Sequence, residues 1–351
     1  MNLIEYGDNR TTMKRWHTDG VKAQMCVTSP PYFGLRSYLS DTDPNKSQEI
    51  GFNQSLSEYI TSLVDTFRCV WDILEDDGTL WLNIGDSYYG GGGYSPTEVS
   101  PKTSKSGKQG SKGSLTIKGT GSLSVDPNIK PKDLIGVPWR LAFALQDDGW
   151  YLRSDIIWEK GNVMPESVRD RPTRSHEYLF LLSKSPQYYY DHVSILEPLQ
   201  PSTLPRMLRG IGTKNKSIDG APGQTKHSLA QPREKRSLVT NLKTGKNKRD
   251  VWHVNTASYK GSHFAVFPPK LIEPCIKAGS KVNDIVLDPF MGSGTTASVC
   301  IDLDRQYLGC ELNESYKPLI ERRIHESINK ERYSELFSTE MVEINESDID
   351  T

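Results

Sequence analysis

The sequence has 351 residues, 35% of them hydrophobic, and its 43 basic and 44 acidic side chains give a net charge of −1. This length can bury a complete α/β core, while the absence of an apolar run of about 20 residues and of a signal peptide predicts a cytoplasmic protein without a membrane segment. The five cysteines form no C-x-x-C pair, so we expect neither a disulfide framework nor a metal site.

The first informative element is an apolar run at residues 21–27, which predicts a buried parallel strand. It is followed at once by Thr28-Ser29-Pro30-Pro31-Tyr32. Two prolines fix the backbone and remove donors, so this segment should be a rigid turn with outward, unpaired carbonyls. Acceptors beside an aromatic ring suit the exocyclic amine of a nucleobase, which must be flipped out of a duplex to reach them. A purely structural turn is the alternative.

Two later segments are basic, although the whole chain is not. Residues 90–132 carry seven lysines against two acids, a local charge of +5, and their glycine-rich composition predicts a flexible loop. Residues 201–250 carry twelve basic and three acidic residues, a local charge of +9, which leaves −15 for the rest. An acidic body with two basic segments is consistent with binding to double-stranded DNA.

The C-terminal part contains a strand, a glycine turn and a helix. Residues 281–287 predict a strand, and the turn Asp288-Pro289-Phe290-Met291-Gly292-Ser293-Gly294-Thr295-Thr296 precedes a helical segment. Glycines let the backbone approach a ligand, and the strand at residues 305–311 ends in Glu311, an acid suited to ribose hydroxyls. This predicts a nucleoside cofactor, with a nicotinamide-type site as the alternative. Pro274-Cys275 lies in a predicted helix, so we expect Cys275 to be buried rather than nucleophilic.

These segments resemble the amino-methylating DNA methyltransferases, which transfer a methyl group from S-adenosyl-L-methionine to cytosine N4 or adenine N6. The resemblance covers most of the chain, and the catalytic motif precedes the cofactor motif, as in the β group of that family. It rests on seven motifs in one order: Tyr6-Gly7-Asp8, residues 28–32, 78–86, 136–158, 176–182, 263–268 and 288–296.

The resemblance implies a doubly wound, mostly parallel α/β sheet with an inserted target-recognition region. Residues 1–196 would form the catalytic half, 197–250 the recognition region, 251–335 the cofactor half and 336–351 an acidic tail. It assigns the base site to Ser29, Pro30, Pro31 and Tyr32. It assigns cofactor binding to Asp8, His263, Phe267, Asp288, Phe290, Gly292, Gly294, Thr295 and Glu311. The recognition region offers basic residues for DNA: Arg206, Arg209, Lys214, Lys216, Arg233, Lys235 and Arg236.

The choice of base follows from the residue before Pro-Pro. Family members that act on adenine usually have Asp or Asn there, and cytosine-N4 enzymes usually have Ser, so Ser29 favours cytosine N4 and leaves adenine N6 as the alternative. A non-catalytic DNA-binding subunit and an RNA methyltransferase are further alternatives. The resemblance also allows a cognate restriction endonuclease as a partner, and we expect a monomer or homodimer.

Overall fold

The computed structural model describes residues 1–34, 37–89, 129–130, 132–199, 245–256 and 267–330, together with the backbone of residues 116–117. The chain divides into two compact units, residues 1–190 with 250–351, and residues 191–249. The first unit contains the sheet and its helices. In the second, the backbones of Glu197 and Lys246 form an antiparallel bridge.

One sheet of eight strands forms the centre of the first unit, within the part of the chain that the structure describes. Its order is β1-β10-β9-β2-β3-β7-β6-β8, and neighbouring strands are parallel except at β3·β7 and β7·β6. The strands are β1 Leu3–Tyr6, β2 Ala23–Thr28, β3 Leu74–Ile84, β6 Tyr151–Glu159, β7 His176–Ser183, β8 Val251–His253, β9 Ile285–Asp288 and β10 Gln306–Glu311. Two short strands, β4 Tyr88–Tyr89 and β5 Thr116–Ile117, form a separate parallel pair.

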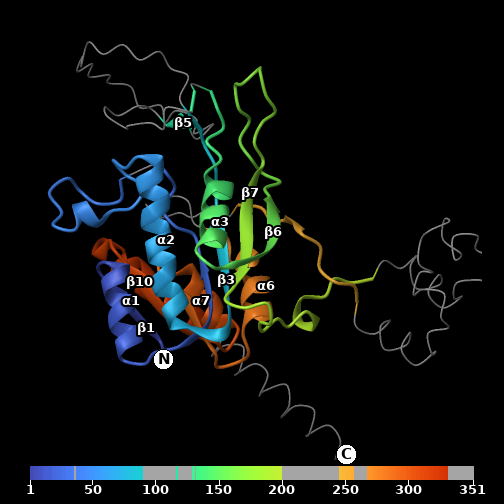
Figure 1. The fold of residues 1–351 in the computed structure, drawn as a ribbon. Helices are drawn as coiled ribbons and strands as arrows, with labels where there is room; N and C mark the ends of the chain where they lie inside the picture. The colour runs from blue at the N-terminus through green and yellow to red at the C-terminus, as the bar shows by residue number, and fades with distance from the viewer. Residues whose placement is uncertain are drawn as a thin grey trace, which may run out of the picture. The chain divides into compact units, whose positions relative to one another are not determined.

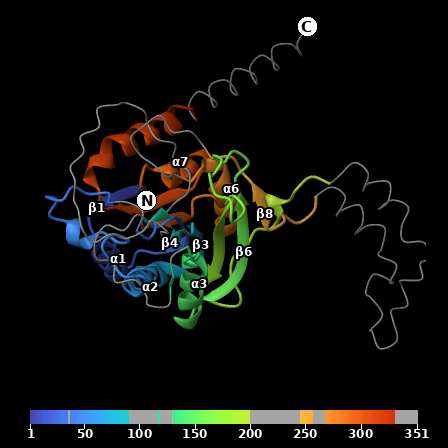
Figure 2. The same cartoon turned by 90° about the horizontal axis from the view of Figure 1, so that it is seen from above.

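Helices cover both faces of this sheet (Figures 1 and 2). One layer contains α1 Asn9–Thr18, α2 Leu56–Ile73 and α3 Val137–Asp147, and the other contains α6 Pro269–Gly279 and α7 Thr295–Asp302. Residues 317–330 are also helical. The predicted α/β sheet with helices on both faces is therefore confirmed.

The alternating side chains of β3 pack against the helices on both faces of the sheet. Successive side chains of a strand point to opposite faces, so Leu80 and Leu82 pack in the core cluster with Phe67 of α2. Trp81 points the other way, where a side chain on Gly279 of α6 would lie 3.0 Å from its Nε1. All three β3 residues are fully buried.

Helix α2 has a clear start signal in the sequence. Ser55 accepts from the backbone N–H of Glu58 and the Glu58 side chain accepts from the N–H of Ser55, which forms a capping box. Helix α6 contains Pro274 in its interior, and Cys275 beside it is buried, as expected from the sequence.

The strand order reverses between β9 and β2. From β9 the chain crosses through α7 to β10 on one side, and from β2 it crosses through α2 to β3 on the other. Ligands of open α/β sheets bind outside the carboxyl ends of the strands at such a switch point. Because β7 is antiparallel to β3, the amino end of β7 also lies at this edge, where Ile84 pairs with Tyr178.

Candidate active site

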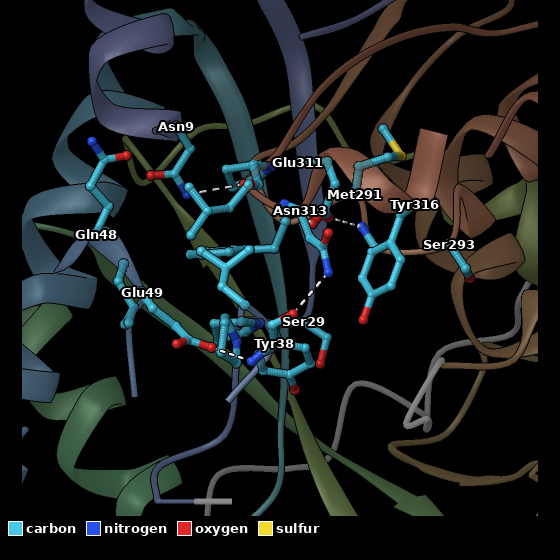
Figure 3. A pocket seen from close by; sticks show the side chains of 18 of the residues that line it. Asn9, Ser29, Tyr38, Gln48, Glu49, Met291, Ser293, Glu311, Asn313 and Tyr316 are labelled. Atoms are coloured by element: carbon cyan, nitrogen blue, oxygen red, sulfur yellow. Dashed lines mark hydrogen bonds between the residues drawn. The ribbon is translucent and has the colours of Figure 1, made fainter. Parts of the chain in front are cut away.

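A pocket opens at the switch point, beside the carboxyl ends of four parallel strands (Figure 3). Residues that follow β1, β2, β9 and β10 line it, together with the segment between β2 and α2. The lining includes Gly7, Asp8, Asn9, Ser29, Pro30, Pro31, Tyr32, Tyr38, Leu39, Gln48, Glu49, Ile50, Phe267, Pro289, Phe290, Met291, Gly292, Ser293, Thr295, Glu311, Leu312, Asn313 and Tyr316. Segments from the two ends of the chain thus meet in one cavity.

The side chain of Tyr32 is fixed by its hydroxyl group. Tyr32 Oη donates to Glu177 Oε2 at 2.6 Å. Burial, and then the negative charge of Glu177, raises the pKa of the Tyr32 phenol well above its ordinary value. Tyr32 therefore stays protonated at neutral pH.

Glu177 is itself held by two further strands. Its side chain forms an ion pair with Lys160, which follows β6, and Asn83 Nδ2 of β3 donates to Oε2 at 3.3 Å. Only 7% of Glu177 is exposed. Glu177 lies within the motif at residues 176–182, but no role could be predicted for it from the sequence. Its contacts depend on the register of β7 against β3, which the sequence does not reveal.

The carbonyls of the proline turn are not all unpaired, contrary to the sequence-based expectation. Tyr59 Oη, from the buried face of α2, donates to the carbonyl of Pro31 at 2.7 Å. Tyr59 lies in the first turn of α2, and its ring lies 5.3 Å from that of Phe33, centroid to centroid. The Pro31 carbonyl therefore has a hydrogen-bond partner within the fold, whereas none of the described residues donates to the carbonyl of Pro30.

Asp288 lies behind the pocket wall and does not line it. Its carboxylate is 1% exposed and accepts from Thr28 Oγ1 at 2.6 Å, Thr296 Oγ1 at 2.5 Å and the backbone N–H of Phe290 at 3.0 Å. Burial raises its pKa to about 6, although these three hydrogen bonds act in the opposite direction. The carboxylate thus fixes the turn after β9, and the cofactor-binding role assigned to Asp288 from the sequence stays a prediction.

The glycine turn has the backbone that its sequence requires. Gly292 and Gly294 have φ angles of 55° and 80°, in the left-handed region that favours glycine. Gly294 precedes α7 as its N-cap and lies outside the pocket lining, whereas Gly292 and Thr295 line the pocket. Arg323, from the last described helix, donates to the hydroxyls of Ser293 and Thr295 and so ties the turn to residues 317–330.

Glu311, the last residue of β10, is a buried acid that lines the pocket. Oε2 accepts from the backbone N–H of Gly292 at 2.7 Å and Oε1 from that of Asn313 at 2.8 Å. Burial raises its pKa to about 7, while these two backbone N–H groups act to lower it. Each oxygen retains acceptor capacity for a neighbouring pair of hydroxyls.

Asp8 and Asn9 form the wall after β1. Asp8 caps α1 by accepting from the backbone N–H of Thr11 at 2.8 Å, and it forms an ion pair with Arg10 at 2.9 Å. Burial acts to raise its pKa, but the hydrogen bonds from Thr11 and Arg10 outweigh burial and lower the pKa. Asn9 Nδ2 donates to the carbonyl of Pro289 at 3.0 Å, which joins this wall to the turn after β9.

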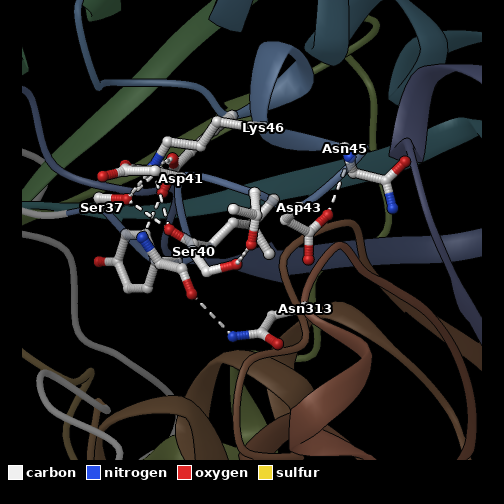
Figure 4. A network of polar contacts seen from close by, with 11 residues as sticks. Ser37, Ser40, Asp41, Asp43, Asn45, Lys46 and Asn313 are labelled. Carbon is white, nitrogen blue, oxygen red and sulfur yellow. Dashed lines mark hydrogen bonds and ion pairs between the residues drawn. The ribbon is translucent and has the colours of Figure 1, made fainter.

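A segment that sequence reasoning did not assign, residues 37–50, covers part of the pocket. Its buried Glu49 binds the N–H of Tyr38 and pairs with Lys46 at 2.9 Å, and Asn313 Nδ2 donates to the carbonyl of Tyr38 at 2.8 Å (Figure 4). The Gln48 Oε1 atom is buried, and it accepts no hydrogen bond from the described residues. This segment has no recognisable motif, so its position at the pocket could not be predicted from the sequence.

Some of the other predicted site residues lie at the pocket, and the rest lie outside the described residues. Phe267 and Phe290 line the pocket. His263 and the basic residues Arg206, Arg209, Lys214, Lys216, Arg233, Lys235 and Arg236 lie outside the described residues, as do most of residues 90–132 and the tail at 336–351. No group of three or more potential metal ligands occurs among the described residues. None of the helices described is long and apolar enough to cross a membrane.

Comparison with known proteins gives matches over nearly the whole chain. The family profile described as DNA methylase matches residues 23–322. Type II methyltransferase M.SmaI from Serratia marcescens is 47% identical over 302 residues, which cover 85% of this chain and 82% of that protein. Type II methyltransferase M.Cfr9I from Citrobacter freundii is 42% identical over 324 residues, with coverages of 91% and 86%.

Two solved structures share the fold. A PvuII DNA methyltransferase, described as cytosine-N4-specific, matches with a TM-score of 0.55 at 14% identity, covering 92% of this chain and 86% of that one. A putative DNA modification methylase from Thermus thermophilus, complexed with S-adenosyl-L-methionine, matches with a TM-score of 0.51 at 18% identity, with coverages of 93% and 94%. At these identities the structural matches establish the fold alone.

Proposed function

The chain belongs to the amino-methylating DNA methylase family and is an S-adenosyl-L-methionine-dependent DNA methyltransferase, and we propose that it methylates N4 of cytosine in double-stranded DNA. The observation that carries this proposal is that Ser29, Pro30 and Tyr32 line the same pocket as Glu311 and the Gly292 turn. A base site and a nucleoside site at these residues would be adjacent.

The groups that line the pocket fit S-adenosyl-L-methionine, the methyl donor. The carboxylate of Glu311 has acceptors left for two ribose hydroxyls, Phe290 and Phe267 supply apolar surface, and the buried Gln48 Oε1 needs a hydrogen-bond donor. We assign cofactor contacts to Asp8, Phe267, Phe290, Gly292, Thr295 and Glu311. Asp288 and Gly294 support them by fixing the turn. The cofactor supplies an activated methyl group, so the protein's work is mainly orientation.

The base site orients the nucleophile. An exocyclic amine is a weak nucleophile because its lone pair is delocalised into the ring. Ser29 Oγ and the Pro30 carbonyl would accept its two N–H hydrogens and favour a tetrahedral nitrogen with the lone pair directed at the methyl group. The Tyr32 ring would stack on the flipped base, which offsets the few kcal/mol that flipping costs. The N–C bond would form as the S–C bond of the sulfonium breaks and leaves a neutral thioether, and the methylated amine, acidic at that stage, would then lose its proton to solvent.

Ser29 before Pro30-Pro31 favours cytosine over adenine. Adenine N6 remains the second candidate, because serine accepts from either amine. The test is to incubate the protein with unmethylated genomic DNA and the cofactor, digest the DNA to nucleosides and analyse them by mass spectrometry. N4-methyldeoxycytidine supports the proposal. N6-methyldeoxyadenosine would overturn the base assignment, and the absence of any methylated nucleoside would favour an RNA substrate or a non-catalytic subunit.

We further propose that residues 197–250 contact the DNA through Arg206, Arg209, Lys214, Lys216, Arg233, Lys235 and Arg236. Most of these side chains would bind phosphate, which positions the duplex without reading its sequence. The relatives are type II methyltransferases, so a companion restriction endonuclease with the same target is expected. Co-expression of neighbouring genes followed by a cleavage assay tests that partner.

A further inference from the structure

We propose that Arg323 is a positioning residue for the cofactor. It holds the hydroxyls of Ser293 and Thr295 so that both direct their hydrogens into the pocket, toward the carboxylate of the methionine part of S-adenosyl-L-methionine. This inference rests on the proposed function, because it concerns the cofactor contacts assigned there to the turn after β9. It adds Ser293 to those contacts and places Arg323 behind them.

The helix that contains Arg323 packs one face on this turn. Ile320 lies against Gly294, where an added Cβ would be 3.2 Å from the Cγ2 of Ile320. The hydroxyls of Ser327 and Ser298 are hydrogen-bonded at 2.7 Å. Arg323 lies between these two contacts, because residues three and four positions apart share one face of a helix. Two contacts that do not involve the guanidinium therefore bring it to the turn.

The direction of the hydrogen bonds at the turn follows from counting hydrogens. Arg323 Nη1 donates to Ser293 Oγ at 2.8 Å and also to Thr295 Oγ1. A guanidinium has no acceptor, so both hydroxyls must accept here. Each hydroxyl keeps its own hydrogen, and neither donates that hydrogen to any of the described residues.

These two hydrogens need an acceptor that the turn itself does not provide. Only 1% of Ser293 and 2% of Thr295 is exposed, so little of either side chain is open to solvent. A buried donor without an acceptor costs free energy, and such groups are rare in native proteins. Both residues line the pocket. A ligand in the pocket would therefore supply the acceptor.

A carboxylate is the acceptor that suits this site best. When ionised it has two oxygens and only accepts, and hydrogen bonds to it are charge-assisted. The guanidinium of Arg323 adds a positive charge directly behind the two hydroxyls. The methionine part of S-adenosyl-L-methionine has one anionic group, its carboxylate, whereas its ammonium and sulfonium groups are cations. The carboxylate would therefore lie at Ser293 and Thr295.

The experiment compares two ligands that differ only in this group, S-adenosyl-L-methionine and its decarboxylated form, by calorimetric titration of wild type and Arg323→Met. We expect Arg323→Met to weaken binding of S-adenosyl-L-methionine about 10–100-fold and binding of the decarboxylated form less than about twofold. Arg323→Lys keeps a cation with three donors and should recover part of the loss.

Arg322→Met is the matched control. It removes a cation from the neighbouring position of the same helix, where Arg322 Nε lies 3.9 Å from Glu326 Oε1. This variant should bind both ligands as wild type does. The control thereby separates the loss of the two hydrogen bonds from the loss of one positive charge on the helix.

Equal losses for both ligands in Arg323→Met would show that Arg323 acts only on the fold and would overturn the inference, as would an unchanged affinity for S-adenosyl-L-methionine. If Arg323→Met does not fold, the double variant Ser293→Ala with Thr295→Val removes the two hydroxyls and leaves Arg323 in place. It should lose the preference for S-adenosyl-L-methionine over the decarboxylated form, and wild-type affinities for both would overturn the inference. The proposed function fails on a different measurement, since wild type would then form no N4-methyldeoxycytidine.

Discussion

Thr28 Oγ1 donates to Asp288 Oδ1 at 2.6 Å, a buried hydrogen bond between residues 260 positions apart. Thr28 is the last residue of β2, directly before the base-site turn, and Asp288 is the last residue of β9, directly before the cofactor turn. This contact, together with the pairing of β2 with β9, therefore joins the two turns that we propose bind the base and the cofactor.

Replacing Thr28 by Val keeps the shape of the side chain and removes the donor. The buried Asp288 carboxylate would lose one of three hydrogen bonds, so we expect the free energy of unfolding to fall by about 1–3 kcal/mol. Urea denaturation measures this change. Thr28→Ser keeps the hydroxyl and should retain most of the stability, and equal midpoints for Thr28→Val and wild type would contradict the prediction.

Cofactor affinity should depend on pH through Glu311. Its pKa in the free protein is raised to about 7, and the ionised form is the better acceptor for two ribose hydroxyls. Binding therefore favours ionisation, so affinity is fully present above pH 7 and is lost as pH falls through 7, by at most about tenfold per pH unit. Calorimetric titration between about pH 6 and 8.5 measures the change.

Glu311→Gln is the control for this pH series. The titration of the ligand itself is common to both proteins, so the difference between them belongs to Glu311. The variant should bind more weakly and lose that part of the pH dependence. A wild-type affinity that does not change across the range would contradict the role given to Glu311.

Gly85→Ala should affect the rate rather than cofactor affinity. The new methyl group would lie 2.7 Å from Tyr32 Cε2, so the ring must move from the base site. We expect single-turnover methylation to slow by at least about tenfold, on the order of one lost stacking interaction of 1–3 kcal/mol. Cofactor binding by calorimetry is the internal reference, and a full methylation rate would show that the ring position is unimportant.

The basic residues proposed to contact DNA predict that DNA binding depends on salt concentration, whereas cofactor binding does not depend on these residues. Replacing Arg233, Lys235 and Arg236 by Gln should weaken DNA binding and reduce the slope of log K against log salt by about 0.9 for each phosphate that is no longer neutralised. Cofactor affinity should stay the same, because the cofactor contacts are assigned to other residues, Glu311 and the turn after β9 among them. Fluorescence anisotropy at several salt concentrations tests this, and an unchanged slope would remove these residues from the interface.

The sequence predicted the parts of the site that depend on local backbone chemistry. The turns after β2 and β9 follow from their prolines and glycines, and Glu311 follows from the end of a strand. Glu177, Asn83 and Lys160 could not be predicted, because their meeting depends on the antiparallel register of β7 between β3 and β6. The position of Asp288 at a strand end does not reveal that the hydroxyls of Thr28 and Thr296 enclose its carboxylate, so its burial could not be predicted from the sequence.

The central claim is that one pocket contains both halves of a methyl transfer, and the paired variants Tyr32→Ala and Glu311→Ala test it most directly. Each would be assayed for calorimetric binding of S-adenosyl-L-methionine and for transfer of its labelled methyl group to unmethylated DNA. We expect Tyr32→Ala to bind the cofactor normally but to transfer the methyl group slowly. We expect Glu311→Ala to fail mainly in cofactor binding. Unchanged binding and transfer in both variants would contradict it.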